Sequence, residues 1–371
     1  MSNNLKFIIS GGGTGGHIFP AVSIANALKK KCPDAEILFV GAEGRMEMEK
    51  VPQAGYQIKG LPIMGMYRGL KNIFKNFKVA YRLLKSNSMA MDIVKEFKPD
   101  AAIGVGGYAS YPTLHAANKQ GIPTFLQEQN GFAGKANIRL GKYARKICVA
   151  FDNMDRFFPK EAIIKTGNPV RQNLSNVEFK DAEALKAFGL SKDKKTLLII
   201  GGSLGAKTVN DSIAGGLEKL KNAGIQVIWQ TGKTYYADCK AKADSSNNAD
   251  LRCQEFVYNM DQAYAVADLV ISRAGASSIS ELCLLGKASI LVPSPNVTED
   301  HQTKNALALS TKDAAILIKD AEAKDKLVDT ALQLLADESR LEQMSKNALA
   351  LAERDSADRI ADIILTEIGK K

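Results

Sequence analysis

The sequence contains few of the features that mark membrane-spanning, secreted or zinc-binding proteins. Among its 371 residues no apolar run approaches the roughly 18 to 20 residues that cross a bilayer. The start, Met1-Ser2-Asn3-Asn4, leads directly into an apolar strand, which predicts no signal peptide. Cysteines are few and odd in number, and no Cys-x-x-Cys pair occurs among Cys32, Cys148, Cys239, Cys253 and Cys283. We therefore expect a reduced, cytosolic protein without structural zinc.

Acidic residues are also fewer than basic ones. Fifty Lys and Arg residues face 40 Asp and Glu, which gives a formal net charge of +10. That balance favours an anionic partner, and it leaves nucleic acid, a membrane surface and phosphorylated substrates open. A hydrophobic content of 45% allows a sizeable core, and the length favours two domains over one.

Two glycine loops are the most informative segments that the chain does contain. Each follows a short apolar strand and opens a helix, and they span Gly11–Gly16 and Gly201–Ala206. Such a loop gathers backbone N–H groups and the positive end of a helix at one point, which suits a phosphate. Because one loop lies in each half, the sequence predicts two similar α/β domains with a ligand between them.

The order of apolar segments supports this organisation. Strand-like runs at 36–40, 101–105, 123–126 and 146–150 alternate with helical patterns, and a turn at Pro169 near 163–171 marks a junction. The alternation restarts at 225–230, 251–257, 268–272, 288–293 and 314–318, and a helical tail begins near 322. We predict two doubly wound domains, at 1–166 and 167–352, with a helix near 353–371 packing back on the first.

The first glycine loop carries a histidine. Gly11–Gly16 satisfies G-x-G-x-x-G, but the next strand ends at Ala42 with Glu43 a little beyond it, so a dinucleotide site is disfavoured. His17 is one of only three histidines and opens a helix beside the loop, where it is a candidate to take a proton from an attacking hydroxyl. The alternative is a capping or packing residue.

In the second half, a strand-to-helix turn runs from Ile271 to Glu281. Its small and hydroxyl residues suit a diphosphate, and Glu281 suits a ribose diol. The alternative for Glu281 is a capping-box carboxylate paired with a preceding serine. Asp300–Asn305 opens a further helix with polar side chains, which fits either sugar hydroxyls or a solvated helix start.

Taken in order, these segments resemble the MurG family of N-acetylglucosaminyltransferases of peptidoglycan synthesis. The match spans nearly the whole chain and is carried by the segments 12–20, 106–108, 128–131, 167–171, 201–203, 272–275 and 302–306. Leu204 and Gln127 depart from the common pattern, in which glutamine and histidine are frequent, and Gln127 excludes a histidine base at that position.

The resemblance implies the GT-B architecture: an α/β fold of two doubly wound Rossmann-like domains facing each other across a cleft. It implies UDP-N-acetylglucosamine as donor, held mainly by the C-terminal domain, and a lipid-linked muramoyl-pentapeptide as acceptor. Glu281 would hold the ribose and the Val257 backbone the uracil. The remaining implied substrate contacts are Ser203, Ala276, Ser277 and Ser278 at the diphosphate, Gln302 and Asn130 at the sugar, Arg171 at the nucleotide sugar, and Thr14, Gly15 and Gly16 near the acceptor diphosphate.

The implied reaction inverts the anomeric centre and needs a base and positive potential at the leaving diphosphate. His17 is the first candidate base and Glu128 the second, while helix N-termini and Arg273 would stabilise the leaving group. No Asp-x-Asp occurs, so we expect no cofactor and no required metal. The rival hypotheses are a UDP-N-acetylglucosamine 2-epimerase and a non-catalytic protein that binds anionic surfaces. No nucleic-acid motif is visible.

A basic amphipathic stretch is the candidate membrane-facing surface. Residues 63–91 include six basic residues and no acidic one, and the basic face consists of Lys71, Lys75, Lys78, Arg82 and Lys85. An apolar stripe that includes Tyr81 and Leu84 lies on another face. The aliphatic and aromatic segment 61–67, which we expect to be exposed beside the basic charge, favours a docking surface. The alternative is an ordinary helix packed on the sheet. A lipid-linked acceptor favours peripheral binding to the cytoplasmic face of an anionic membrane.

Overall fold

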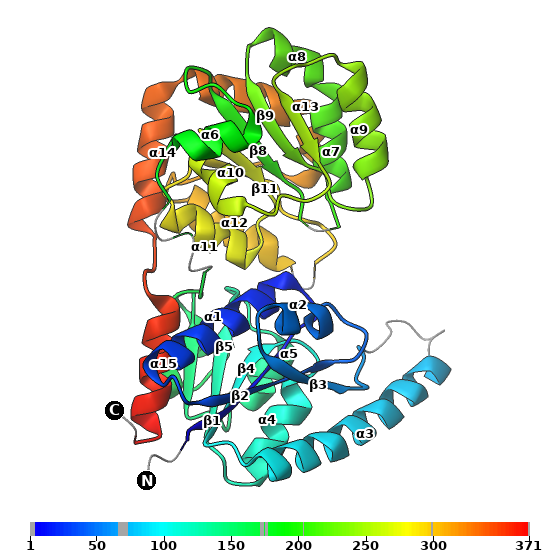
Figure 1. The fold of residues 1–371 in the computed structure, drawn as a ribbon, viewed down its shortest axis with the longest axis vertical. Coiled ribbons are helices and arrows are strands. Elements are labelled where there is room, and N and C mark those ends of the chain that lie inside the picture. The colour runs from blue at the N-terminus through cyan, green and yellow to red at the C-terminus, as the bar shows by residue number, and fades with distance from the viewer. Residues whose placement is uncertain are drawn as a thin grey trace. The chain divides into compact units, whose positions relative to one another are not determined.

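The computed structural model describes residues 4–65, 73–170, 174, 177–202, 204–297 and 300–369, with only the backbone of the helical residues 73–78. Within it the chain forms two compact units. The first comprises Met1–Arg171 together with Arg354–Lys371, and the second comprises Gln172–Glu353. Each unit is a parallel sheet with helices on both faces (Figure 1).

The first unit contains a seven-stranded sheet in the order β3-β2-β1-β4-β5-β6-β7. Every neighbouring pair is parallel. The strands are β1 (Lys6–Gly11), β2 (Glu36–Ala42), β3 (Gln57–Leu61), β4 (Ala101–Gly106), β5 (Thr124–Glu128), β6 (Lys146–Val149) and β7 (Ile163–Lys165). The strand order reverses between β1 and β4, as in Rossmann-like folds.

Both faces of this sheet are buried, because successive side chains of a strand point in opposite directions. Phe7 and Ile9 pack in one core with α1 (Gly15–Lys31) and α15 (Ser356–Glu367). Ile8 packs in the other core with α3 (Ile73–Phe97), α4 (Ser110–Lys119) and α5 (Lys135–Leu140). The short helix α2 (Glu47–Gln53) follows β2.

The last helix of the chain, α15, completes the first unit. Ile360, Ala361 and Ile364 are buried in the same core as α1. Ion pairs Lys30–Asp358 and Lys31–Asp362 link the two helices at the surface. The N-terminal core therefore depends on residues from the far end of the sequence.

The second unit repeats the plan with six parallel strands in the order β10-β9-β8-β11-β12-β13. The strands are β8 (Thr196–Ile200), β9 (Gln226–Gln230), β10 (Leu251–Gln254), β11 (Leu269–Ser272), β12 (Ser289–Leu291) and β13 (Ile316–Leu317). Its helices are α6 (Ala182–Phe188), α7 (Lys207–Gly215), α8 (Leu217–Asn222), α9 (Tyr236–Ser245), α10 (Met260–Val266), α11 (Ala276–Leu284), α12 (His301–Ser310), α13 (Asp320–Ala336) and α14 (Glu338–Ala350). The order reverses between β8 and β11.

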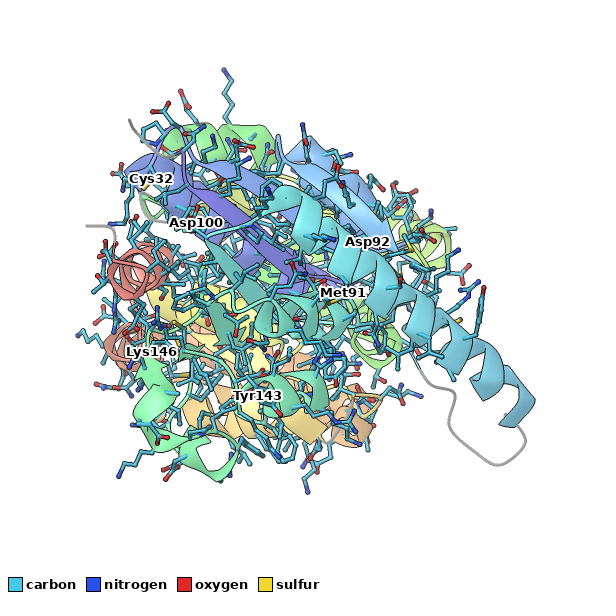
Figure 2. The ribbon with its side chains drawn as sticks, turned by 90° about the horizontal axis from the view of Figure 1, so that it is seen from below. Cys32, Met91, Asp92, Asp100, Tyr143 and Lys146 are labelled. Atoms are coloured by element: carbon cyan, nitrogen blue, oxygen red, sulfur yellow. The ribbon has the colours of Figure 1, made fainter. Side chains whose placement is uncertain are left out.

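Helix α3 is 25 residues long, and its two halves differ in packing. Ala90, Ile93 and Val94 are buried against the sheet. Tyr81 and Leu84 near the other half are 67% and 69% exposed. In Figures 1 and 2 the N-terminal half of α3 extends away from the sheet, whereas Met91 and Asp92 lie where the helix runs over the unit. The alternative of a helix packed on the sheet along its whole apolar stripe is therefore wrong at Tyr81 and Leu84. The expected exposure of segment 61–67 is also wrong at Leu61 and Ile63, which are buried in the core of the first unit because β3 ends there beside the sheet.

The predicted α/β class with two doubly wound, Rossmann-like units is confirmed. The apolar runs that predicted strands lie on β2, β4, β5, β6 and on β9 to β13. One strand, β3, was missed because its residues alternate between exposed and half-buried and form no apolar run. An edge strand needs no continuous apolar segment.

We expect Ile364→Ala to lower the free energy of unfolding of the first unit by about 2–5 kcal/mol, the cost of a large-to-small core substitution. Ile364 is fully buried. Urea unfolding measures the change, and Thr366→Ala on the exposed side of α15 is the matched control. Equal unfolding midpoints for the two variants would show that α15 contributes nothing to the core.

Candidate active site

The two sheets each have a point where the strand order reverses, and ligands of such folds bind beside the carboxyl ends of the strands there. In the first unit the loops after β1 and β4 meet at this point, since Gly12 N–H donates to Gly106 O at 3.2 Å. In the second unit the loops that follow β8 and β11 occupy the corresponding place. The sequence predicts chemistry in three of these loops, and the fourth, after β4, is one of the segments that carry the family resemblance.

The first glycine loop is held by a buried carboxylate. Glu47, the first residue of α2, is 1% exposed, and its Oε2 accepts from Gly13 N–H at 2.8 Å. Its Oε1 accepts from Ala42 N–H at 3.0 Å. A Cβ on Gly12 would lie 2.2 Å from Glu47 Cδ, so only glycine leaves room for this contact. One N–H of the predicted phosphate loop is therefore already engaged within the protein.

His17 is half-buried at the start of α1 and contacts the same loop. Its Nδ1 lies 3.0 Å from Gly12 O and 3.3 Å from Thr14 Oγ1. A carbonyl oxygen cannot donate, so Nδ1 carries the proton and the neutral ring has its lone pair on Nε2. The Nε2 side of the ring lies against Gly106, where a Cβ would be 2.9 Å from Nε2. His17 does not cap the helix, because Thr14 is the N-cap residue.

Thr14, Gly15 and Gly16 lie beside His17, as predicted. Helix α1 has no acidic residue in its first turn and no side-chain cap at Thr14. The His17 backbone N–H donates to Thr14 O at 3.1 Å, and the uncapped, acid-free helix end suits an anionic group.

Glu128 lies at the end of β5, is 2% exposed, and organises the loop that follows. Its Oε1 accepts from the backbone and side-chain nitrogens of Asn130, at 3.1 and 3.4 Å. Its Oε2 accepts from Gly134 N–H and Asn137 Nδ2, both at 3.0 Å. Four donors therefore surround this carboxylate. It holds the loop after β5 in place and keeps Asn130 beside it.

Buried amides replace the histidine that the common family pattern has at Gln127. Gln127 Nε2 donates to Asn168 Oδ1 at 2.9 Å, and Asn168 Nδ2 donates to Gln129 O at 3.0 Å. Gln129 Nε2 donates to Val105 O at 2.8 Å. The network joins the ends of β4 and β5 to the segment after β7.

The second glycine loop packs closely against the segment that follows β9. Gly205 packs so closely on the end of β9 that a Cβ would lie 2.2 Å from Thr231 O. Gly205 N–H donates to Gly202 O at 3.1 Å. Two predicted contacts, Ser203 in this loop and Arg171 near the junction, lie outside the described residues.

Helix α11 presents its N-terminus at the reversal point of the second sheet. Gly275 is the N-cap and offers no side chain, and the first turn, which contains Ala276, Ser277 and Ser278, has no acidic residue. The Ser277 hydroxyl is buried, and among the described residues it has no hydrogen-bond partner. These N–H groups and hydroxyls suit the diphosphate that was predicted here.

Glu281 lies beyond the first turn of α11 and is 7% exposed. Its Oε2 accepts from the Tyr264 hydroxyl at 3.0 Å. A capping box needs the carboxylate three residues after the N-cap, whereas Glu281 is six residues after Gly275. The capping-box alternative is therefore wrong.

Val257 and Gln302 are both partly engaged within the second unit. Val257 N–H donates to Gln230 Oε1 at 3.1 Å, which leaves the Val257 carbonyl as the group available to a ligand. Gln302 Oε1 accepts from Ser294 N–H at 2.8 Å, and within the described part of the chain its Nε2 has no hydrogen-bond acceptor. Asn305, one turn later on α12, donates to Ala274 O at 3.3 Å and ties α12 to the α11 loop.

Arg273 follows β11, and its guanidinium points toward the next strand. Nη1 donates to Val292 O and Pro293 O, each at 3.1 Å, and pairs with Asp320. Its charge is therefore shared with a carboxylate of α13. Arg273 therefore connects the end of β11 to the end of β12.

Burial disfavours the thiolate form of two cysteines, Cys148 and Cys283. Burial raises the pKa of Cys148 to about 12, against smaller lowering effects of Thr166 and Arg359. Burial also raises the pKa of Cys283, two residues after Glu281, to about 12. Among the described residues no group of His, Cys, Asp and Glu side chains is arranged to hold a metal ion.

The sequence analysis did not identify three residues that hydrogen-bond to the candidate site: Glu47, Gln230 and Tyr264. Each is a buried polar side chain that supports a predicted site residue from a different element. The signal that pointed toward Glu47 was the pair of glycines at 12 and 41, both of which leave space for its side chain.

Comparison with known proteins agrees with this architecture. The model of the glycosyltransferase family 28 N-terminal domain matches residues 7–149, and that of the C-terminal domain matches residues 196–360. A Parabacteroides distasonis protein named UDP-N-acetylglucosamine–N-acetylmuramyl-(pentapeptide) pyrophosphoryl-undecaprenol N-acetylglucosamine transferase is 58% identical over 99% of both chains.

Solved structures show the same fold. The crystal structure of Acinetobacter baumannii MurG superposes with a TM-score of 0.77 at 28% identity and covers 98% of this chain and 99% of that one. The UDP-GlcNAc 2-epimerase from Neisseria meningitidis gives a TM-score of 0.68 at 16% identity, covering 98% of this chain and all of that one. At 16% identity the second likeness concerns the fold alone.

Fold and site together define a glycosyltransferase built from two Rossmann-like domains. The chain belongs to glycosyltransferase family 28 and, within it, to the MurG family. Neither the epimerase alternative nor the non-catalytic alternative is favoured.

Proposed function

We propose that this enzyme transfers N-acetylglucosamine from UDP-N-acetylglucosamine to the C4 hydroxyl of the muramoyl-pentapeptide diphospho-undecaprenol lipid. The observation that carries the proposal is the orientation of His17, whose Nε2 bears the lone pair beside the N-terminus of α1. The names of the full-length relatives support the choice of donor and acceptor. Incubation with UDP-N-acetylglucosamine and a short-chain acceptor analogue should yield the disaccharide lipid. An epimerase would instead change the sugar without any acceptor.

In this proposal the second unit binds the donor, UDP-N-acetylglucosamine. Glu281 would accept from the ribose diol, and the Val257 carbonyl would accept from the uracil N3–H. The diphosphate would bind the N–H groups of Ala276, Ser277 and Ser278 at the start of α11. Gln302 Nε2 would donate to a sugar hydroxyl. Ser203 and Arg171 are retained from the family resemblance.

The first unit is assigned the acceptor. The Thr14–Gly16 loop would receive the acceptor diphosphate, with Asn130 contacting the sugar. His17 Nε2 takes the proton of the C4 hydroxyl while the hydroxyl oxygen forms the new bond to C1 of the sugar. The electron pair of the broken C1–O bond leaves with UDP on the opposite face, which inverts the anomeric centre.

The roles of the other charged groups follow from their partners. Glu128, with donors to both oxygens, positions Asn130 and the loop through Gly134, and His17 is favoured as the base. The N-terminus of α11 would provide most of the positive potential at the departing diphosphate, because the Arg273 charge is shared with Asp320. The proposed mechanism uses no metal ion.

We also propose that the first unit docks on the cytoplasmic face of an anionic membrane through the N-terminal half of α3. No helix in the described part of the chain is long and apolar enough to cross a bilayer. Tyr81 and Leu84 are exposed beside the predicted basic residues Arg82 and Lys85. Lys71 lies outside the described residues, and only the backbone of Lys75 and Lys78 is described.

His17→Ala should lower turnover about 10²–10⁴-fold, the usual loss for a general base, and leave UDP affinity nearly unchanged. Steady-state kinetics with the acceptor analogue and calorimetry with UDP measure the two effects. His115→Ala, in the same unit but on α4, is the control. Turnover close to the parent value in His17→Ala would move the role of base to another residue.

Glu281→Ala should weaken UDP binding by roughly 1.5–3 kcal/mol, the range for a hydrogen bond to a charged group. Calorimetry measures the affinity, and a thermal melt checks folding, because Glu281 also accepts from Tyr264. Glu255→Ala, an exposed carboxylate of the same unit, serves as the control. If a folded Glu281→Ala variant binds UDP like the parent, the ribose assignment is wrong.

The double variant Arg82→Glu/Lys85→Glu should lose co-sedimentation with anionic vesicles and keep UDP affinity. Each basic residue near such a surface contributes about 1 kcal/mol, and reversal makes it repulsive. Lys312→Glu/Lys324→Glu in the second unit changes the net charge equally and is the control. Equal sedimentation of the two double variants would exclude α3 as the docking surface.

A further inference from the structure

The peptide group between Gly12 and Gly13 is hydrogen-bonded at both ends. Its carbonyl, on Gly12, accepts from His17 Nδ1 at 3.0 Å. Its N–H, on Gly13, donates to Glu47 Oε2 at 2.8 Å. A single peptide unit therefore lies between a buried carboxylate and the imidazole of the proposed base.

We propose that Glu47 is a positioning residue for the reaction, acting on His17 through the Gly12–Gly13 peptide group. The inference rests on the proposed role of His17 as the base. Glu47 does not touch the reacting atoms. Its function is to hold the proton of His17 on Nδ1 and to increase the basicity of Nε2.

The buried environment of Glu47 leaves its carboxylate to interact with the Gly12–Gly13 peptide group. The side chain is 1% exposed, and in the described part of the chain its two oxygens accept only from backbone N–H groups, those of Gly13 and Ala42. Among the described residues no lysine, arginine or histidine nitrogen lies within ion-pair distance of it. Of the charged neighbours on its own segment, Glu43, Arg45 and Glu49 are exposed to solvent, and Lys50 is half-buried and pairs with Glu49 at 3.0 Å. The two N–H groups therefore stabilise the negative charge of the buried carboxylate.

Hydrogen bonds in a chain polarise one another. A carboxylate that accepts from Gly13 N–H increases the negative charge on Gly12 O, which strengthens the bond from His17 Nδ1–H. The same interaction stabilises the imidazolium that forms when Nε2 takes the hydroxyl proton. An aspartate bonded directly to the imidazole has this role in serine proteases. Here a peptide group separates the two side chains.

The packing keeps the three groups in register. Gly12 must be glycine because its Cα faces the Glu47 carboxylate, and Gly41 also faces the Glu47 stem, where a Cβ would lie 2.6 Å from Cγ. Gly12 N–H is bonded to Gly106 O, and the imidazole lies against Gly106. The peptide plane therefore has little freedom to rotate away from either side chain.

The kinetic test uses Glu47→Gln, which keeps the shape and removes the charge, with Glu49→Gln on the exposed side of α2 as the control. We expect kcat to fall about 10- to 100-fold, as for residues that orient a functional histidine, with KM for the acceptor analogue little changed. Because Glu47 acts through His17, His17→Ala/Glu47→Gln should be no slower than His17→Ala alone. Parent-like kcat in Glu47→Gln, or a further loss in the double variant, would overturn the proposal.

A spectroscopic test reads the tautomer of His17 in the parent protein, and the variants serve only to assign the signal and to test its dependence on Glu47. The chain has three histidines, so ¹⁵N-histidine spectra can be assigned by comparison with His17→Ala. The neutral His17 ring should carry its proton on Nδ1, and Glu47→Gln should shift it toward a mixture of tautomers. A proton on Nε2 in the parent would overturn the proposal.

The two proposals fail in different ways. Full turnover in His17→Ala removes the base and, with it, the role of Glu47. Lost turnover in His17→Ala together with parent-like kcat in Glu47→Gln removes only the role of Glu47.

Discussion

Close approach of one backbone segment to another at the strand ends is the constraint on which the site depends. A Cβ on Gly107 would lie 2.5 Å from Gly12 O, and one on Gly205 would lie 2.2 Å from Thr231 O. Both contacts occur where parallel strands end beside the reversal of strand order. Without them the loops after β1 and β8 would stand away from their neighbours, and the N–H groups and side chains at the strand ends would not converge.

Buried hydrogen bonds then determine which of the converging groups remain available to a ligand. In the first unit Glu47 occupies Gly13 N–H, and Glu128 is surrounded by donors, so the proposed acceptor chemistry is assigned to the first turn of α1 and the His17 ring. In the second unit Gln230 occupies Val257 N–H, while the N-terminus of α11 has no cap from its own side chains. In each unit, backbone N–H groups that are bonded within the protein thus lie within a short distance along the chain of groups that a ligand could bind.

Sequence alone predicted the strands with continuous apolar runs, the two glycine loops and the position of His17, because these features are local. It missed β3, whose alternating exposure gives no apolar run, and it could not show that Glu281 lies past the first turn of α11. Glu47, Gln230 and Tyr264 escaped because each supports a residue on another element. Such pairings depend on sheet register and helix packing, which single-sequence patterns do not contain.

The place of α15 in the first unit has a consequence for synthesis of the protein. Because α15 covers the apolar face of α1, the N-terminal core is incomplete until the whole second unit has left the ribosome. At about 5–20 residues per second this takes about 10 to 40 seconds, during which that face is open to solvent or to a chaperone. The second unit is contiguous in sequence and can complete its own core first, so the nascent chain matures from the middle outward.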